Sequence, residues 1–176
     1  MRTDYLLEKE VQLVLDLLTF ENRLLARLLL HTGIRVGDAL QLKPEQLRPN
    51  FWITEQKTGK RRQVGIPEPL LSDLLDNSGT VWVFPGADPS KPRTRQALWK
   101  DVKRAAKAAR LTTNAAPHSL RKVYAVDLLQ RYGDIDRVRR ALNHGGIEVT
   151  LIYAMADKRL RAAGRRRRSA PGRKRA

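Results

Sequence analysis

The chain has 176 residues, of which 41% are hydrophobic, 35 are Lys or Arg and 18 are Asp or Glu. This length and hydrophobic content predict one folded domain with its own core and exclude a chain that is disordered throughout. Cysteine is absent, which excludes disulfides and thiolate metal sites, and no apolar run reaches the roughly 18 residues of a membrane span. With only three histidines, we expect no metal site, no cofactor and no membrane association, and a cytoplasmic location.

The positive charge is unevenly distributed. Ten basic and no acidic residues follow Asp157, so that residues 1–157 carry +7 of the formal net charge of +17. A basic body with a still more basic tail predicts a partner of dense negative charge, and nucleic acid is the first candidate. RNA-binding and ribosomal proteins share this balance, so charge alone leaves the kind of nucleic acid open.

Hydrophobic periodicity predicts an α+β domain that is mainly α, with one small sheet. Two strands with a turn at 57–60 are expected to form a hairpin, and a short apolar run to add a third strand, giving a three-stranded antiparallel sheet. The expected helices are 6–18, 21–33, 36–42, 68–75, 94–110, 117–133 and 134–146, and the expected strands are 51–56, 62–67 and 81–84. The Arg-rich segment after residue 161 lacks apolar periodicity and is expected to be a disordered tail.

Four segments carry residues suited to phosphoryl transfer without a metal. Such a transfer needs a hydroxyl nucleophile, fixed positive charge on the phosphate oxygens and a proton donor for the leaving oxygen. Arginine suits the oxygens because its planar fork stays charged, and lysine and histidine suit proton transfer. The candidates are Arg35 after a glycine turn, Lys57 at the hairpin tip, His118 and Arg121 at a helix start, and His144 nine residues before Tyr153.

Together these segments resemble the catalytic domain of the tyrosine recombinases, the phage integrase family. The family's T-G-x-R-x-x-E/D segment, hairpin lysine, H-x-x-R helix, L-G-H turn and tyrosine all occur in order, over about residues 5–155. Two positions depart from the pattern, because Asn143 stands where the family has Gly before the histidine and Gly37 stands where Ser is commoner. Asn tolerates a left-handed backbone, so the turn can survive.

The resemblance implies a role for each matching residue. Tyr153 attacks a DNA phosphate to give a 3′-phosphotyrosyl bond and a free 5′-hydroxyl, without metal or ATP. Arg35 and Arg121 bind the nonbridging oxygens, and Lys57 protonates the leaving oxygen. His118 assists proton transfer to or from the tyrosine, and His144 donates a hydrogen bond to the phosphate. Asp38 stands at the position of the family's acidic residue that supports the site.

Some assignments leave alternatives open. Lys60, Arg61 and Arg62 share the hairpin with Lys57, and any of them could take its role. Tyr124 and Tyr132 are alternative nucleophiles, although both are expected to be packing residues. The cations expected to contact DNA outside the chemistry are Lys60, Arg61, Arg62, Arg95, Lys122, Arg165, Arg166, Arg167 and Arg168.

The resemblance predicts a catalytic domain over residues 1–160 and a basic tail over 161–176. We expect the family's separate N-terminal core-binding domain to be absent, in which case the protein is either a minimal recombinase similar to the fimbrial phase-switch enzymes or a truncated catalytic domain. We expect a bacterial, phage or mobile-element site-specific recombinase that binds double-stranded DNA as a homotetramer and is a monomer or dimer when free. The alternatives are a type IB topoisomerase and a noncatalytic DNA-binding regulator of the same fold.

Overall fold

The structure is a computed structural model that describes residues 3–142, 155 and 156. Helices dominate it, as the periodicity predicts, and most lie within two or three residues of their expected bounds. The elements are α1 (Glu8–Leu17), α2 (Phe20–Thr32), α3 (Val36–Ala39), the 3₁₀ turn η1 (Pro44–Gln46), β1 (Asn50–Thr54), β2 (Arg61–Gly65), α4 (Glu68–Asp76), α5 (Arg95–Ala108), α6 (Pro117–Tyr132) and α7 (Ile135–Leu142). No helix in the described ranges is long and apolar enough to cross a membrane.

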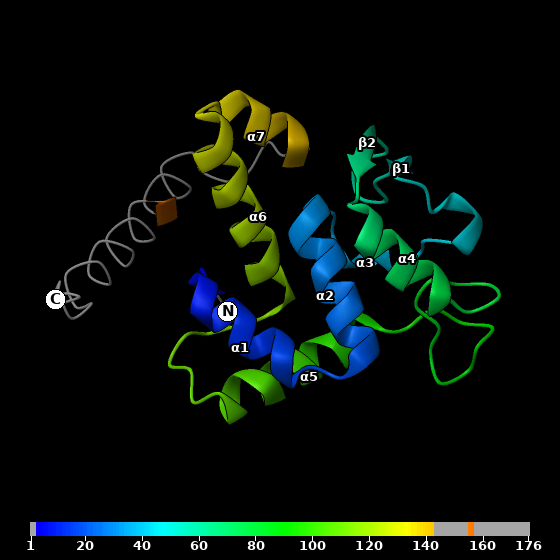
Figure 1. Cartoon of the computed structure of the whole chain (residues 1–176), viewed down its shortest axis with the longest axis horizontal. Helices are drawn as coiled ribbons and strands as arrows, with labels where there is room; N and C mark the ends of the chain where they lie inside the picture. The colour runs from blue at the N-terminus through cyan, green and yellow to red at the C-terminus, as the bar shows by residue number, and fades with distance from the viewer. Residues whose placement is uncertain (1–2, 143–154, 157–176) are drawn as a thin grey trace, which may run out of the picture.

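Helix α2 lies at the centre of the molecule and organises the core. It packs against α6 on one side and against α4, α3 and β2 on the other, while α1 and α5 pair below it (Figure 1). Leu25, Leu28 and Leu29 on α2 are almost fully buried. Met155 and Ala156 also belong to the core.

The hairpin is confirmed, with β1 and β2 antiparallel and Thr54 opposite Arg61. Its loop runs over residues 55–60, and Gly59 adopts a left-handed φ of 66° while its N–H donates to the carbonyl of Glu55 at 2.8 Å. The prediction of a third strand at 81–84 is wrong, because the sheet of the described chain has two strands. Val83 and Phe84 are buried in an irregular segment instead, where the N–H of Val83 donates to the carbonyl of Leu42 at 3.0 Å, while Val81 is exposed.

Candidate functional site

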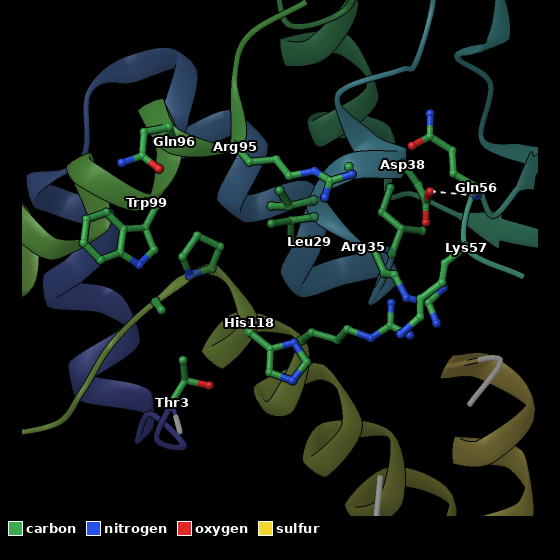
Figure 2. A pocket seen from close by; sticks show the side chains of 16 residues that line it. Thr3, Leu29, Arg35, Asp38, Gln56, Lys57, Arg95, Gln96, Trp99 and His118 are labelled. Carbon is green, nitrogen blue, oxygen red and sulfur yellow. Dashed lines mark hydrogen bonds between the residues drawn. The ribbon is translucent and has the colours of Figure 1, made fainter. Parts of the chain in front are cut away.

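A cavity of about 660 Å³ opens between α3, the hairpin loop, α5 and α6 (Figure 2). Segments far apart in the sequence supply its polar lining. Its charged, amide and imidazole side chains are Arg35, Asp38, Gln56, Lys57, Arg95, Gln96, His118 and Arg121. The four residues of 1–142 that are expected to act directly on the phosphate, Arg35, Lys57, His118 and Arg121, therefore lie around one cavity.

The turn after α2 positions Arg35. Gly33 ends this helix with φ 61° and donates its N–H to Leu29 at 2.9 Å, which turns the chain so that Arg35 begins α3. A Cβ at Gly33 would lie 2.1 Å from Cδ1 of Tyr124, since the tyrosine ring packs on the glycine. Glycine is thus required here for both backbone conformation and space.

Arg121 joins this turn to the end of α7. Its Nη1 donates to the carbonyl of Gly33 at 2.7 Å and its Nη2 to that of Leu142 at 2.5 Å, with 3% of the residue exposed. Burial, together with the charges of Arg35 and Arg62, lowers its pKa to about 10. The guanidinium still carries its charge at neutral pH, and it anchors the last described residue before the segment 143–154.

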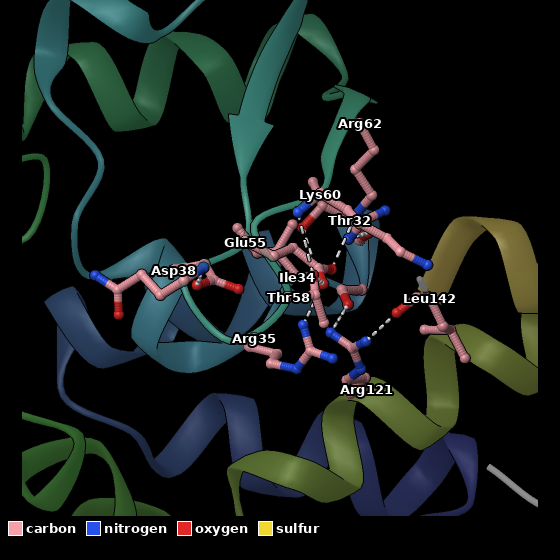
Figure 3. Close-up of polar contacts among 12 residues, drawn as sticks. Thr32, Ile34, Arg35, Asp38, Glu55, Thr58, Lys60, Arg62, Arg121 and Leu142 are labelled. Atoms are coloured by element: carbon pink, nitrogen blue, oxygen red, sulfur yellow. Dashed lines mark hydrogen bonds and ion pairs between the residues drawn. The ribbon is translucent and has the colours of Figure 1, made fainter. Parts of the chain in front are cut away.

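The residue that sequence reasoning missed is Glu55. Its side chain is fully buried, it forms an ion pair with Nη1 of Arg35, and its Oε1 lies 3.6 Å from Nε of Arg62 (Figure 3). The Thr58 hydroxyl donates to Glu55 Oε2 at 3.0 Å. A signal was present in the sequence, since Glu55 is the one acidic residue between Gln46 and Pro67.

Asp38 fixes the hairpin loop against α3. Its Oδ1 accepts a hydrogen bond from the backbone N–H of Gln56 at 3.0 Å, and only 7% of the residue is exposed. Because Gln56 precedes Lys57, this contact positions the lysine at the mouth of the cavity. Lys60 and Arg61 are exposed on the same loop and strand, with the Arg61 guanidinium 5.2 Å from the Trp52 ring.

His118 is neutral at pH 7 when no phosphate is near. Burial and the positive charges of Lys122, Arg121 and Arg35 all disfavour its charged form and lower its pKa below the ordinary 6.5. A neutral imidazole on the cavity wall can accept a proton as well as donate one, which is the property that acid–base catalysis requires.

Arg95, at the start of α5, occupies space that a glycine leaves open. A Cβ on Gly37 would lie 2.3 Å from Nη2 of Arg95 and 2.8 Å from its Cζ. Gly37, which stands where Ser is commoner in the family, therefore leaves room for the Arg95 guanidinium to pack against α3. The guanidinium adds a further positive charge beside Arg35 in the cavity.

Two cations expected at the surface are turned inward. Nη2 of Arg62 donates to the carbonyl of Thr32 at 3.1 Å, and 11% of this side chain is exposed. Lys122 is 7% exposed and its ammonium donates to the carbonyl of Thr3. Both therefore serve contacts within the protein. Four expected groups lie outside the described residues, namely His144, Tyr153, the tail arginines Arg165, Arg166, Arg167 and Arg168, and Asn143.

The charges around the cavity favour a negatively charged ligand. Cations outnumber the two nearby carboxylates, Asp38 and Glu55, and both of these are engaged with the surrounding protein. Low exposure strengthens the field that these charges create. Within residues 3–142, 155 and 156, no three His, Asp or Glu side chains gather as ligands for a metal ion.

Residues 4–159 match the model of the phage integrase family. The chain belongs to this family. It is 35% identical over 154 residues to the integrase of Escherichia phage P2, a match that covers 86% of this chain and 43% of the relative. The resemblance drawn from the sequence motifs is therefore confirmed.

Solved structures of the family have the same fold. The XerH site-specific recombinase bound to difH DNA in a post-cleavage complex is 26% identical, with a TM-score of 0.68 over 91% of this chain and 52% of that one. A lambda integrase tetramer on a Holliday junction is 19% identical, with a TM-score of 0.69 over 90% and 49%. This chain spans about half the length of these proteins and of the P2 integrase.

Proposed function

We propose that this protein cuts and rejoins double-stranded DNA at specific sites through a covalent bond to Tyr153. The observation that carries the proposal is the meeting of Arg35, Lys57, His118 and Arg121 around one cavity, from segments that span 87 positions of the sequence. Membership of the phage integrase family supports it. A protein that only binds DNA has no need for this set of proton donors and guanidiniums in one hollow.

In the proposed reaction, a bond forms between the Tyr153 oxygen and the phosphorus of the DNA backbone while the bond from phosphorus to the 5′-oxygen breaks. The tyrosine loses its proton, with His118 as acceptor or relay, and Lys57 gives a proton to the departing 5′-oxygen. Arg35 and Arg121 bind the nonbridging oxygens, where charge grows in the transition state, and His144 donates a further hydrogen bond. Attack by a 5′-hydroxyl on the phosphotyrosine reverses these steps and rejoins the strand.

Electrostatic contacts outside the cavity hold the DNA backbone. We assign this role to exposed Lys60 and Arg61 and to Arg165–Arg168 in the tail, and we leave out the inward-facing Arg62 and Lys122. Arg95 lines the cavity and is proposed to contact the backbone from there. Recombination joins two duplexes, each cut on both strands, so the active assembly is proposed to be a homotetramer. The lambda integrase tetramer on a Holliday junction is a precedent for this arrangement.

A pool of nicked duplexes of randomised sequence tests the proposal. Cleavage close to a nick releases a short fragment, so rejoining fails and the protein stays attached to the DNA. Covalent complexes are isolated under denaturing conditions, and their DNA is sequenced. The proposal expects complexes enriched in a defined sequence. Complexes without sequence preference would indicate a topoisomerase, and DNA binding without any covalent complex would leave only a regulator.

A further inference from the structure

We propose that Glu55 is a positioning residue that aims Arg35 at the scissile phosphate, an inference that rests on the proposed function. A fully buried carboxylate is costly unless it is paired, and Glu55 is paired with the side chain expected to bind the phosphate. The carboxylate also accepts a hydrogen bond from Thr58 at 3.0 Å. It is thus itself held in place by the hairpin loop.

The contact uses one end of the Arg35 fork. Glu55 Oε2 accepts from Nη1 of Arg35, and in the described part of the chain no other hydrogen bond of this guanidinium is formed. The Arg35 side chain is 20% exposed and lines the cavity. Nη2 and Nε therefore remain for two phosphate oxygens, which is the bidentate geometry that arginine forms with phosphate.

Glu55 also separates positive charges that would otherwise repel one another. Arg35 and Arg62 approach the same carboxylate from two sides, and the Arg121 guanidinium is close enough to both for their charges to lower its pKa. Without the carboxylate, Arg35 would move away from these neighbours and toward solvent. Glu55, in the hairpin loop, thereby sets the position of the Arg35 side chain at the N-cap of α3 through a single contact (Figure 3).

This role makes a prediction opposite to that of simple electrostatics. Replacing Glu55 with Gln keeps the shape of the side chain and adds one unit of positive charge beside the phosphate site. Charge alone would then tighten DNA binding and speed cleavage. If Glu55 positions Arg35, its replacement instead slows cleavage, because the Arg35 guanidinium is displaced and a displacement of about 1 Å in a catalytic group can cost roughly 10²-fold in rate. We expect unchanged or tighter binding together with cleavage about 10- to 100-fold slower.

The test is a double-mutant cycle on a nicked duplex that the wild-type protein cleaves. Single-turnover rates of covalent attachment and dissociation constants are measured for the wild type, Glu55→Gln, Arg35→Lys and the double variant. If Glu55 acts through Arg35, Glu55→Gln has little further effect in the Arg35→Lys background. Glu45→Gln, an exposed change of equal charge on η1, is the matched control and is expected to cleave at the wild-type rate.

Each outcome bears on a different claim. No attachment by the wild-type protein on any duplex overturns the proposed function itself. Two results would overturn the role of Glu55 alone, provided that the wild-type protein becomes attached to DNA. One is an unchanged attachment rate in Glu55→Gln, and the other is a double variant whose loss of rate is the product of the losses in the two single variants. Should Glu55→Gln be unfolded at the assay temperature, Glu55→Asp replaces it. The shorter carboxylate is then expected to slow cleavage with DNA binding intact, and wild-type cleavage by Glu55→Asp would contradict the proposal.

Discussion

Replacing Gly33 with Ala should destabilise the protein through two separable effects. A residue with a Cβ at φ 61° pays about 1–2 kcal/mol for the left-handed conformation. The same Cβ would lie 2.1 Å from the Tyr124 ring, and such overpacking costs typically about 1–3 kcal/mol. The free energy of unfolding should therefore fall by about 2–5 kcal/mol, a large part of the roughly 5–15 kcal/mol that is usual for a domain.

Gly133 provides the matched control because it ends α6 as Gly33 ends α2. Its φ is 67°, its N–H donates to Leu129 at 2.7 Å, and a Cβ there would meet nothing within 4 Å. Gly133→Ala should thus lose only the backbone component of about 1–2 kcal/mol. Urea denaturation measures the free energy of unfolding of both variants. In a Tyr124→Ala protein, Gly33→Ala and Gly133→Ala should lose the same free energy of unfolding. Equal losses in the two glycine variants would refute the role assigned to the ring.

Three further predictions concern the cavity and the tail. A bound phosphate should raise the pKa of His118, which burial and neighbouring cations lower in the free protein, so DNA binding takes up a proton at pH values between the free and the bound pKa. NMR titration of His118 with and without DNA measures both pKa values, and an unchanged pKa contradicts the site. Gly37→Ala should keep or raise the melting temperature, because Ala favours helix, yet it should weaken DNA binding by displacing the Arg95 guanidinium. If Gly37→Ala weakened DNA binding as much in an Arg95→Ala protein as in the wild type, displacement of Arg95 would be excluded as the cause. Ending the chain after Arg161 removes seven cations and should make the slope of log affinity against log salt shallower by roughly 0.9 for each phosphate that the tail neutralises, and an equal slope would mean that the tail is not on the DNA.

The sequence predicted the elements better than their contacts. Helix α2 has a regular apolar stripe and a glycine stop, and the hairpin has a glycine turn between two short strands, so local signals suffice for both. The run 81–84 is equally apolar, but a strand needs a partner, and a partner is a property of the tertiary fold. Its backbone bonds to Leu42 instead of to the sheet.

The site was predictable only as far as motifs reach. Arg35, Lys57, His118 and Arg121 match family motifs, and the structure places all four around one cavity. The burial of Glu55 left no periodic pattern to read, because it follows from how the hairpin loop packs on α3. Charge counts likewise treat every cation alike, although a long side chain such as that of Lys122 can turn inward and bond to a backbone carbonyl.

The identity of the attacking residue is the most direct test of the central claim. Protein trapped on a nicked duplex is digested with trypsin, and mass spectrometry locates the tyrosine that carries the nucleotide. The account predicts attachment at Tyr153, complete loss of the covalent complex in Tyr153→Phe with DNA binding nearly unchanged, and persistence in Tyr124→Phe and Tyr132→Phe. Attachment at Tyr124 or Tyr132, or a covalent complex that survives in Tyr153→Phe, would contradict it.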